Sequence, residues 1–183
     1  MKKISRLLAL SLSVLAISFV SVNAQDFSGE IPEAALEREV ERQILRLPYY
    51  ELFDYITYKV EGNTVTLSGK VRNGVNRSDA EGVVKRITGV EKVVNNIEIL
   101  PPGRNDEVIR RNVARSLANT GNLSRYLWPV NPPVRIVVDR GHVTLEGTVS
   151  SQADSNMANI AARSVPGAFS VTNNLVVDSK RAG

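Results

Sequence analysis

Hydrophobic residues recur along this chain with two alternating periods, one typical of helices and one typical of strands. Between residues 32 and 47 an apolar residue returns every three or four positions, which predicts an amphipathic helix. Two short segments that alternate apolar with polar residues follow, then a second helical period and a final strand-like segment. The predicted elements are a helix over 32–47, strands over 56–60 and 65–71, a helix over 80–87 and a strand over 93–99.

The same series occurs a second time, 78 positions further along the chain. The strand Val65–Val71 reads Val-Thr-Leu-Ser-Gly-Lys-Val, and Val143–Val149 reads Val-Thr-Leu-Glu-Gly-Thr-Val. The same offset brings Gly89 onto Gly167, so the register extends well beyond the strand. We interpret this as an internal duplication. Two copies, each long enough to form a small domain, indicate tandem domains and not a solenoid.

The second copy begins with a helix that we expect Asn105 to cap. Its next helix begins with Ser151 and Asp154, which have capping-box-like spacing. Between its first helix and first strand, about five extra residues lie within 119–133. The predicted boundaries are 33–100 for the first domain, 101–104 for a proline-rich linker and 105–178 for the second domain. We expect a cut in the linker to leave two folded fragments.

Four glycines are predicted to be structural. Gly69 and Gly147 fall in the inward-facing row of their strands, where glycine marks a bulge, a close backbone approach or room for packing. Of these, we favour room for a helix to pack on the sheet. Gly89 and Gly167 follow the second helix of each copy, and Gly89 suits a left-handed C-terminal cap.

Residues 1–24 have the features of a secretory signal peptide. Three bases precede an apolar run from Leu7 to Val20, and Val22-Asn23-Ala24 provides small or apolar side chains for cleavage. The run is too short for a stable membrane span. We therefore predict an exported chain, periplasmic or secreted, that is soluble after cleavage near Ala24.

Removing the predicted signal changes the charge balance. The remaining chain has 20 Lys and Arg against 19 Asp and Glu, a net charge of +1, so the basic pI mostly reflects the signal. Residues 25–103 carry −3 and residues 104–183 carry +4. A nucleic-acid binder would show a stronger basic footprint. A negatively charged surface that contacts only the second half fits the asymmetry.

The residues needed for catalysis or metal binding are scarce. The chain has no Cys and a single His, His142, so disulfides, Cys/His zinc sites and His-based catalytic sets duplicated in both copies are excluded. Glycine-rich phosphate loops are missing too. We predict a protein that is not an enzyme and that uses no metal, no cofactor and no small-molecule substrate.

Aromatic residues concentrate before the first strand of each copy. Six of the nine aromatic residues after the signal lie in 49–55 or 119–133, including Tyr126 and Trp128. Proline-bounded aromatic loops of this kind can form a binding surface. The alternative is that they fold back and close the end of a small core. We favour the closing role for the first loop and leave both open for the second.

The repeated pattern resembles the BON domain, a bacterial module named for osmotic-stress and nodulation proteins. The resemblance rests on Val-x-Val-x-x-Gly-x-Val-Thr-Leu-x-Gly-x-Val, a short helix, then Pro-Gly and a strand containing Asn-Asn-Leu. It implies an α+β fold of two small αββαβ domains, each a three-stranded mixed sheet packed by two helices. It also implies an envelope protein, with attachment to phospholipid surfaces proposed as the shared role. Two departures are the lack of an acylatable Cys and the change of Gly89-Val90 to Gly167-Ala168.

Two classes of function follow, and the first is favoured. One is a non-enzymatic envelope protein that binds anionic phospholipid surfaces, in osmotic or envelope stress. The other is a protein-interaction or chaperone-like scaffold for an envelope protein. For lipid binding we hypothesise that bases on the outer side of the second domain's first helix act together with the aromatic loop. The predicted residues are Arg110, Arg111, Arg115, Arg125, Tyr126 and Trp128.

Overall fold

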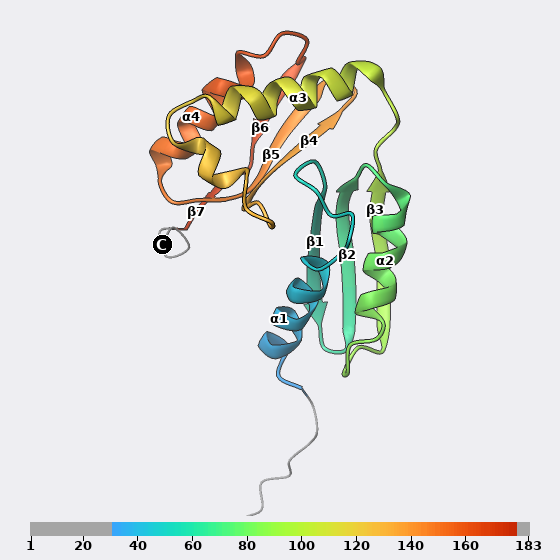
Figure 1. The fold of residues 1–183 in the computed structure, drawn as a ribbon. Helices are drawn as coiled ribbons and strands as arrows, with labels where there is room; N and C mark the ends of the chain where they lie inside the picture. The colour runs from blue at the N-terminus through green and yellow to red at the C-terminus, as the bar shows by residue number, and fades with distance from the viewer. Residues whose placement is uncertain (1–30, 179–183) are drawn as a thin grey trace, which may run out of the picture. The chain divides into compact units, whose positions relative to one another are not determined.

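A computed structural model describes residues 31–178, so the predicted signal peptide lies outside the described residues. Two repeats follow one another (Figure 1). The first contains α1 (Glu33–Ile44), β1 (Tyr55–Glu61), β2 (Thr64–Val71), α2 (Gly74–Val84) and β3 (Lys92–Ile99). The second contains α3 (Arg104–Ala118), the 3-10 helix η1 (Leu123–Tyr126), β4 (Val134–Asp139), β5 (His142–Val149), α4 (Gln152–Arg163), β6 (Ser170–Asn173) and β7 (Val176–Val177).

The two sheets have the same mixed topology. In the first, β2 pairs antiparallel with β1 and parallel with β3. In the second, β5 pairs antiparallel with β4 and parallel with β6 and β7. The parallel pair begins at Thr64↔Lys92 in the first sheet and at His142↔Ser170 in the second, which is the same register. Because β7 keeps that register, β6 and β7 together correspond to β3. The predicted fold class is confirmed.

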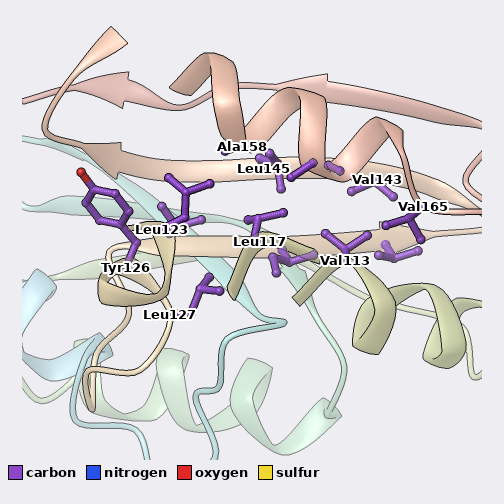
Figure 2. Packing of buried hydrophobic residues seen from close by; sticks show 14 of the residues in the cluster. Val113, Leu117, Leu123, Tyr126, Leu127, Val143, Leu145, Ala158 and Val165 are labelled. Atoms are coloured by element: carbon purple, nitrogen blue, oxygen red, sulfur yellow. The ribbon is translucent and has the colours of Figure 1, made fainter. Parts of the chain in front are cut away.

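Each sheet has its own apolar core beneath a pair of helices. Leu36, Val40 and Ile44 project from α1 into the first core, and Ile109, Val113 and Leu117 project from α3 into the second. Both triplets have the spacing of a single helix face. Figure 2 shows the second core, in which α3, α4, η1 and the strands all contribute side chains. Burial of this stripe, more than helix propensity, fixes each helix on its sheet.

The inward glycines serve a different purpose from the one predicted. A Cβ on Gly69 would lie 2.1 Å from the backbone oxygen of Tyr55, and one on Gly147 would lie 2.0 Å from that of Pro133. Their φ angles are +122° and +105°, which L side chains rarely adopt. The backbone at the start of the neighbouring strand, and not a helix, therefore requires these glycines. Gly89 and Gly167 have positive φ and follow α2 and α4, as the sequence suggested.

The helix starts are partly as predicted. Ser151 is the N-cap of α4: its Oγ accepts a bond from the Asp154 backbone N–H at 3.1 Å and donates to the Asp154 carboxylate at 2.7 Å. The prediction for Asn105 was wrong, because α3 starts at Arg104 with Gly103 as N-cap.

The two repeats touch through the first aromatic loop. The backbone N–H of Ile136, in β4, donates to the carbonyl of Leu52 at 3.0 Å, and Phe53 also packs against the second core. Arg135 donates to the Glu51 carbonyl at 2.8 Å, and its guanidinium lies 4.2 Å from the centre of the Tyr50 ring. This loop thus lies between the two cores.

Two ion pairs also cross between the repeats. Lys70 contacts Asp139 at 2.6 Å, and Arg72 contacts Glu107 at 3.1 Å. The hydrogen bond that Lys70 donates to the Asp139 carboxylate lowers the pKa of Asp139 and raises the pKa of Lys70. Within residues 31–178, every helix is too short or too polar to cross a membrane.

Candidate functional site

The two aromatic loops are buried to different extents. In the first loop Tyr50 is buried, and its hydroxyl accepts a bond from the Ile56 N–H at 3.0 Å. In the second loop Trp128 is 68% exposed and Val130 is 94% exposed. Tyr50 therefore closes the first core, which is the role predicted for this loop, whereas Tyr49 is 56% exposed and Leu52 and Phe53 pack against the second core. The second divides into a buried half, in which Leu123, Tyr126 and Leu127 reach the core, and an exposed half from Trp128 to Asn131.

Tyr126 belongs to the buried half, so its predicted place in a membrane interface was wrong. The ring lies at one end of the second core beside Leu123 (Figure 2). Its hydroxyl bonds Ser150 and donates to the Asp154 carboxylate at 2.9 Å. Arg125 donates to the same carboxylate at 3.0 Å and lies over the Tyr126 ring. A tyrosine held in this way closes the core and is not available to lipid.

Asp154 is the centre of this polar cluster. Burial alone would raise its pKa, but hydrogen bonds from Ser151, Tyr126 and Ser150, with the charge of Arg125, outweigh burial and lower it. The ionised carboxylate therefore fixes the start of α4 and the end of η1 together.

The predicted outward position of Arg110 was also wrong. Its side chain is buried and donates to the Val138 carbonyl at 2.6 Å and to Glu107 at 3.1 Å. Arg110 lies one position after the buried stripe residue Ile109, on the flank of α3 that faces β4. An arginine with these internal partners neutralises Glu107 and contributes no charge to the outer surface.

Arg111 and Arg115 lie where the sequence placed them. Both are exposed on α3, one helical turn apart, and no carboxylate within residues 31–178 pairs with either. Val108, three positions before Arg111, is exposed as well. Of the six predicted lipid-binding residues, Arg111, Arg115, Arg125 and Trp128 are therefore exposed.

The acidic residues of the second repeat are less exposed than its arginines. Six of its eight described arginines are exposed, whereas none of its six acidic residues is. Asp106 accepts the backbone N–H groups of Arg140 and Gly141, at 2.8 Å each, and Glu146 accepts from Asn174 at 2.8 Å. Glu107 and Asp139 form the ion pairs described above, and Asp154 is the centre of the polar cluster. Asp178 is partly buried. The outer surface is thus more basic than the net charge suggests.

This arrangement offers positive charge and apolar side chains to a ligand. The second repeat presents arginines together with isolated exposed apolar side chains, the combination that anionic membrane interfaces attract. Among residues 31–178 no group of three His, Asp or Glu side chains is placed to hold a metal ion.

Val130 and Phe169 are exposed apolar residues that the sequence analysis did not select. Val130 follows Trp128 closely, and its position in a loop between prolines gave only a weak signal. Phe169 could have been found by aligning the two copies, because the offset of 78 places it opposite Glu91. A phenyl group in place of a surface carboxylate is a change that burial in the core does not explain.

Comparison with known families gives the class of protein. Residues 32–101 and 105–179 each match the BON domain. The matches cover most of the chain, which therefore belongs to the BON-domain family as a tandem protein.

A related curated protein is osmotically-inducible protein Y of Escherichia coli strain K12. The two are 32% identical over 124 residues, an alignment that covers 66% of this chain and 60% of that protein. The chain thus spans less than two thirds of the length of this relative.

Two similar solved structures are of CdsD, a structural protein of the type III secretion system of Chlamydia trachomatis. One, of its C-terminal domain, is 13% identical, covers 81% of this chain and 100% of the solved chain, and has a TM-score of 0.31. The other is 14% identical, covers 80% and 94%, and has a TM-score of 0.30. Scores this low support no conclusion about function.

Proposed function

We propose that this protein is an exported, non-enzymatic envelope protein whose second repeat binds the surface of anionic phospholipid membranes. The observation that supports this most is the charge arrangement of that repeat, in which six of the eight described arginines are exposed and the acids are buried or partly buried. The exposed bases of the predicted lipid-binding site are Arg111 and Arg115 on α3 and Arg125 on η1. Trp128 and Val130 supply apolar side chains that enter the headgroup region.

The expected affinity is weak. Each base near an anionic surface contributes about 1 kcal/mol, so Arg111 and Arg115 contribute roughly 2 kcal/mol. Arg125 adds less, because it is paired with Asp154. Together with the transfer of an indole and a valine into the interface, this gives binding that is reversible, selective for acidic lipids and sensitive to salt.

Vesicle flotation of the chain from residue 25 tests the proposal. We expect the protein to float with phosphatidylglycerol-containing vesicles at low salt, to remain behind with phosphatidylcholine vesicles, and to be released by about 0.5 M salt. Equal recovery with both kinds of vesicle, or with neither, contradicts it.

Trp128 reports separately on the loop, because it is the only tryptophan in the chain. We expect its emission to shift to shorter wavelength with the acidic vesicles and to return when salt is added. Flotation without any shift would remove the loop from the contact and leave only the arginines.

A further inference from the structure

We propose that the open end of the second repeat is a docking groove for an extended, acidic protein segment that carries an aliphatic side chain. The groove has a volume of about 540 Å³. Its apolar wall includes Val108, Ile109, Pro166 and Phe169, and Arg140 lies on its rim.

The first repeat shows what fills the equivalent place. There Ile31, just before α1, lies over Gly89, so that a Cβ on Gly89 would be 3.1 Å from the Ile31 Cδ1. Ile31 also packs against the first core. An aliphatic side chain, delivered by a segment outside the helix, thus closes this end of the first repeat.

The second repeat has no such closing residue. When α1 and α3 are aligned on their buried stripes, Leu36 corresponds to Ile109 and Ile31 corresponds to Arg104, the first residue of α3. The nearest atom to a Cβ on Gly167 would be Ile109 Cγ1, at 3.7 Å. The place that Ile31 takes in the first repeat is therefore hollow, and Gly167 lines it.

An exposed phenyl ring borders the hollow. Phe169 donates its backbone N–H to the Gly141 carbonyl at 2.8 Å, just as Glu91 donates to Asn63 at 2.9 Å in the first repeat. The backbone is thus equivalent, but the side chain has changed from a carboxylate to a phenyl group that is 81% exposed. A ring fixed against Gly141 offers its outer face to an apolar ligand at little entropic cost.

The shape and charge of the groove favour an extended acidic segment. A second hollow of about 380 Å³ shares Asn105, Asp106 and Arg140 with the groove and continues it along the linker. Arg104 and Arg140 are exposed beside it, whereas the Asp106 carboxylate is bound to two backbone N–H groups. Arginines aligned along an elongated hollow attract carboxylates on either side of an apolar anchor.

The backbone conformation of Arg140 supports the assignment of this groove as a docking site. Its φ is +50°, in the left-handed region, where the equivalent residue of the first repeat is Gly62. Arginine is uncommon in this conformation, and strained residues of this kind concentrate at functional sites.

The chain itself supplies a probe with the required chemistry. Residues 28–34 read Ser-Gly-Glu-Ile-Pro-Glu-Ala, an isoleucine between two glutamates. We would titrate this peptide, capped at both ends, into the isotope-labelled chain from residue 25 and follow the backbone amides by NMR. We expect the shifts of Gly141, Gly167 and Phe169 to move, with a dissociation constant on the order of 1 mM or tighter.

Two matched changes decide the outcome. Ile31→Ser in the peptide and Phe169→Glu in the protein should each weaken binding about tenfold or more, whereas Glu91→Gln and Arg111→Gln should change it less than about twofold. Equal binding of the serine peptide, or shifts outside the groove, overturns the proposal. If the groove does not bind the peptide but the Phe169→Glu variant no longer floats with acidic vesicles, the groove is a lipid contact. That result also overturns the proposal.

Discussion

Helices α1 and α3 carry arginines at the same two positions relative to their buried stripes, yet the surfaces around those arginines differ. Arg38 and Arg42 on α1 correspond to Arg111 and Arg115 on α3. Around the first pair the helix has Glu37, Glu39 and Glu41, and Arg42 pairs with Glu39. At the corresponding positions α3 has Arg110, Asn112 and Ala114. One duplicated helix has thus become a mixed, self-neutralised surface and the other a basic one.

The loops diverge in the same direction. In the first repeat Leu52 and Phe53 pack against the second core and are partly buried there. In the second repeat the segment around Trp128 has no comparable cover. The two copies therefore share the strand register and the cores, and differ in their surfaces.

The largest expected effect tests what the copies share. We expect Gly147→Val to destabilise the fold by about 3 kcal/mol or more, since the side chain would meet the Pro133 carbonyl and φ is positive. Gly69→Val should cost a similar amount. Chemical denaturation measures both, with Gly62→Ala as a control at about 1 kcal/mol, because no atom lies within 4 Å of a Cβ there. Equal costs for Gly147→Val and the control would contradict a close backbone approach.

The next effect concerns the contact between the repeats. A cut in the linker at Pro102 should leave two folded fragments, and the isolated second repeat should be less stable than in the whole chain by about 2 kcal/mol, because it loses Leu52 and Phe53. Thermal unfolding of the fragments and of the intact chain measures the difference. A fragment that unfolds at the same temperature as in the intact chain would show that the loop contact contributes nothing.

A smaller effect of opposite sign is expected at Arg140. Replacing it by glycine, the residue at the equivalent turn of the first repeat, should stabilise the fold by about 0.5–1 kcal/mol, because glycine adopts positive φ without strain. The same variant should weaken peptide docking in the groove. Calorimetry measures the first change, and a destabilised variant would refute the strain at Arg140.

The smallest expected effect is on pH dependence. The bond from Lys70 lowers the pKa of Asp139, so this ion pair stabilises the fold above the unfolded pKa and its contribution disappears as pH falls through the folded value, below about pH 4. Both side chains are partly exposed, which limits the effect to below about 1 kcal/mol. Unfolding free energies at pH 7 and pH 3 should differ less in Asp139→Asn than in the parent. Glu61→Gln, which affects only the exposed pair with Lys59, is the control.

The sequence predicted the repeat, its topology and the stripe of each helix because periodicity directly reflects burial against one sheet. It failed at Arg110, since a residue beside the stripe is buried only when its flank meets another strand. Tyr126 was misplaced for a similar reason, because its partners Ser150 and Asp154 are distant in sequence. The groove at Phe169 exists because Gly167 lacks a covering side chain such as the one that Ile31 places over Gly89. A local sequence pattern cannot indicate that such a side chain is missing.

The central claim is that the second repeat, and not the first, meets the anionic surface. Its most direct test compares Arg111→Gln/Arg115→Gln with Arg38→Gln/Arg42→Gln, which remove the same two charges from equivalent positions. Partition of each variant into phosphatidylglycerol vesicles is measured at low salt against the parent chain. We expect the α3 variant to lose about 30-fold, the equivalent of about 2 kcal/mol, and the α1 variant to change less than about threefold. Equal losses in both variants, or a larger loss in the α1 variant, would contradict the account.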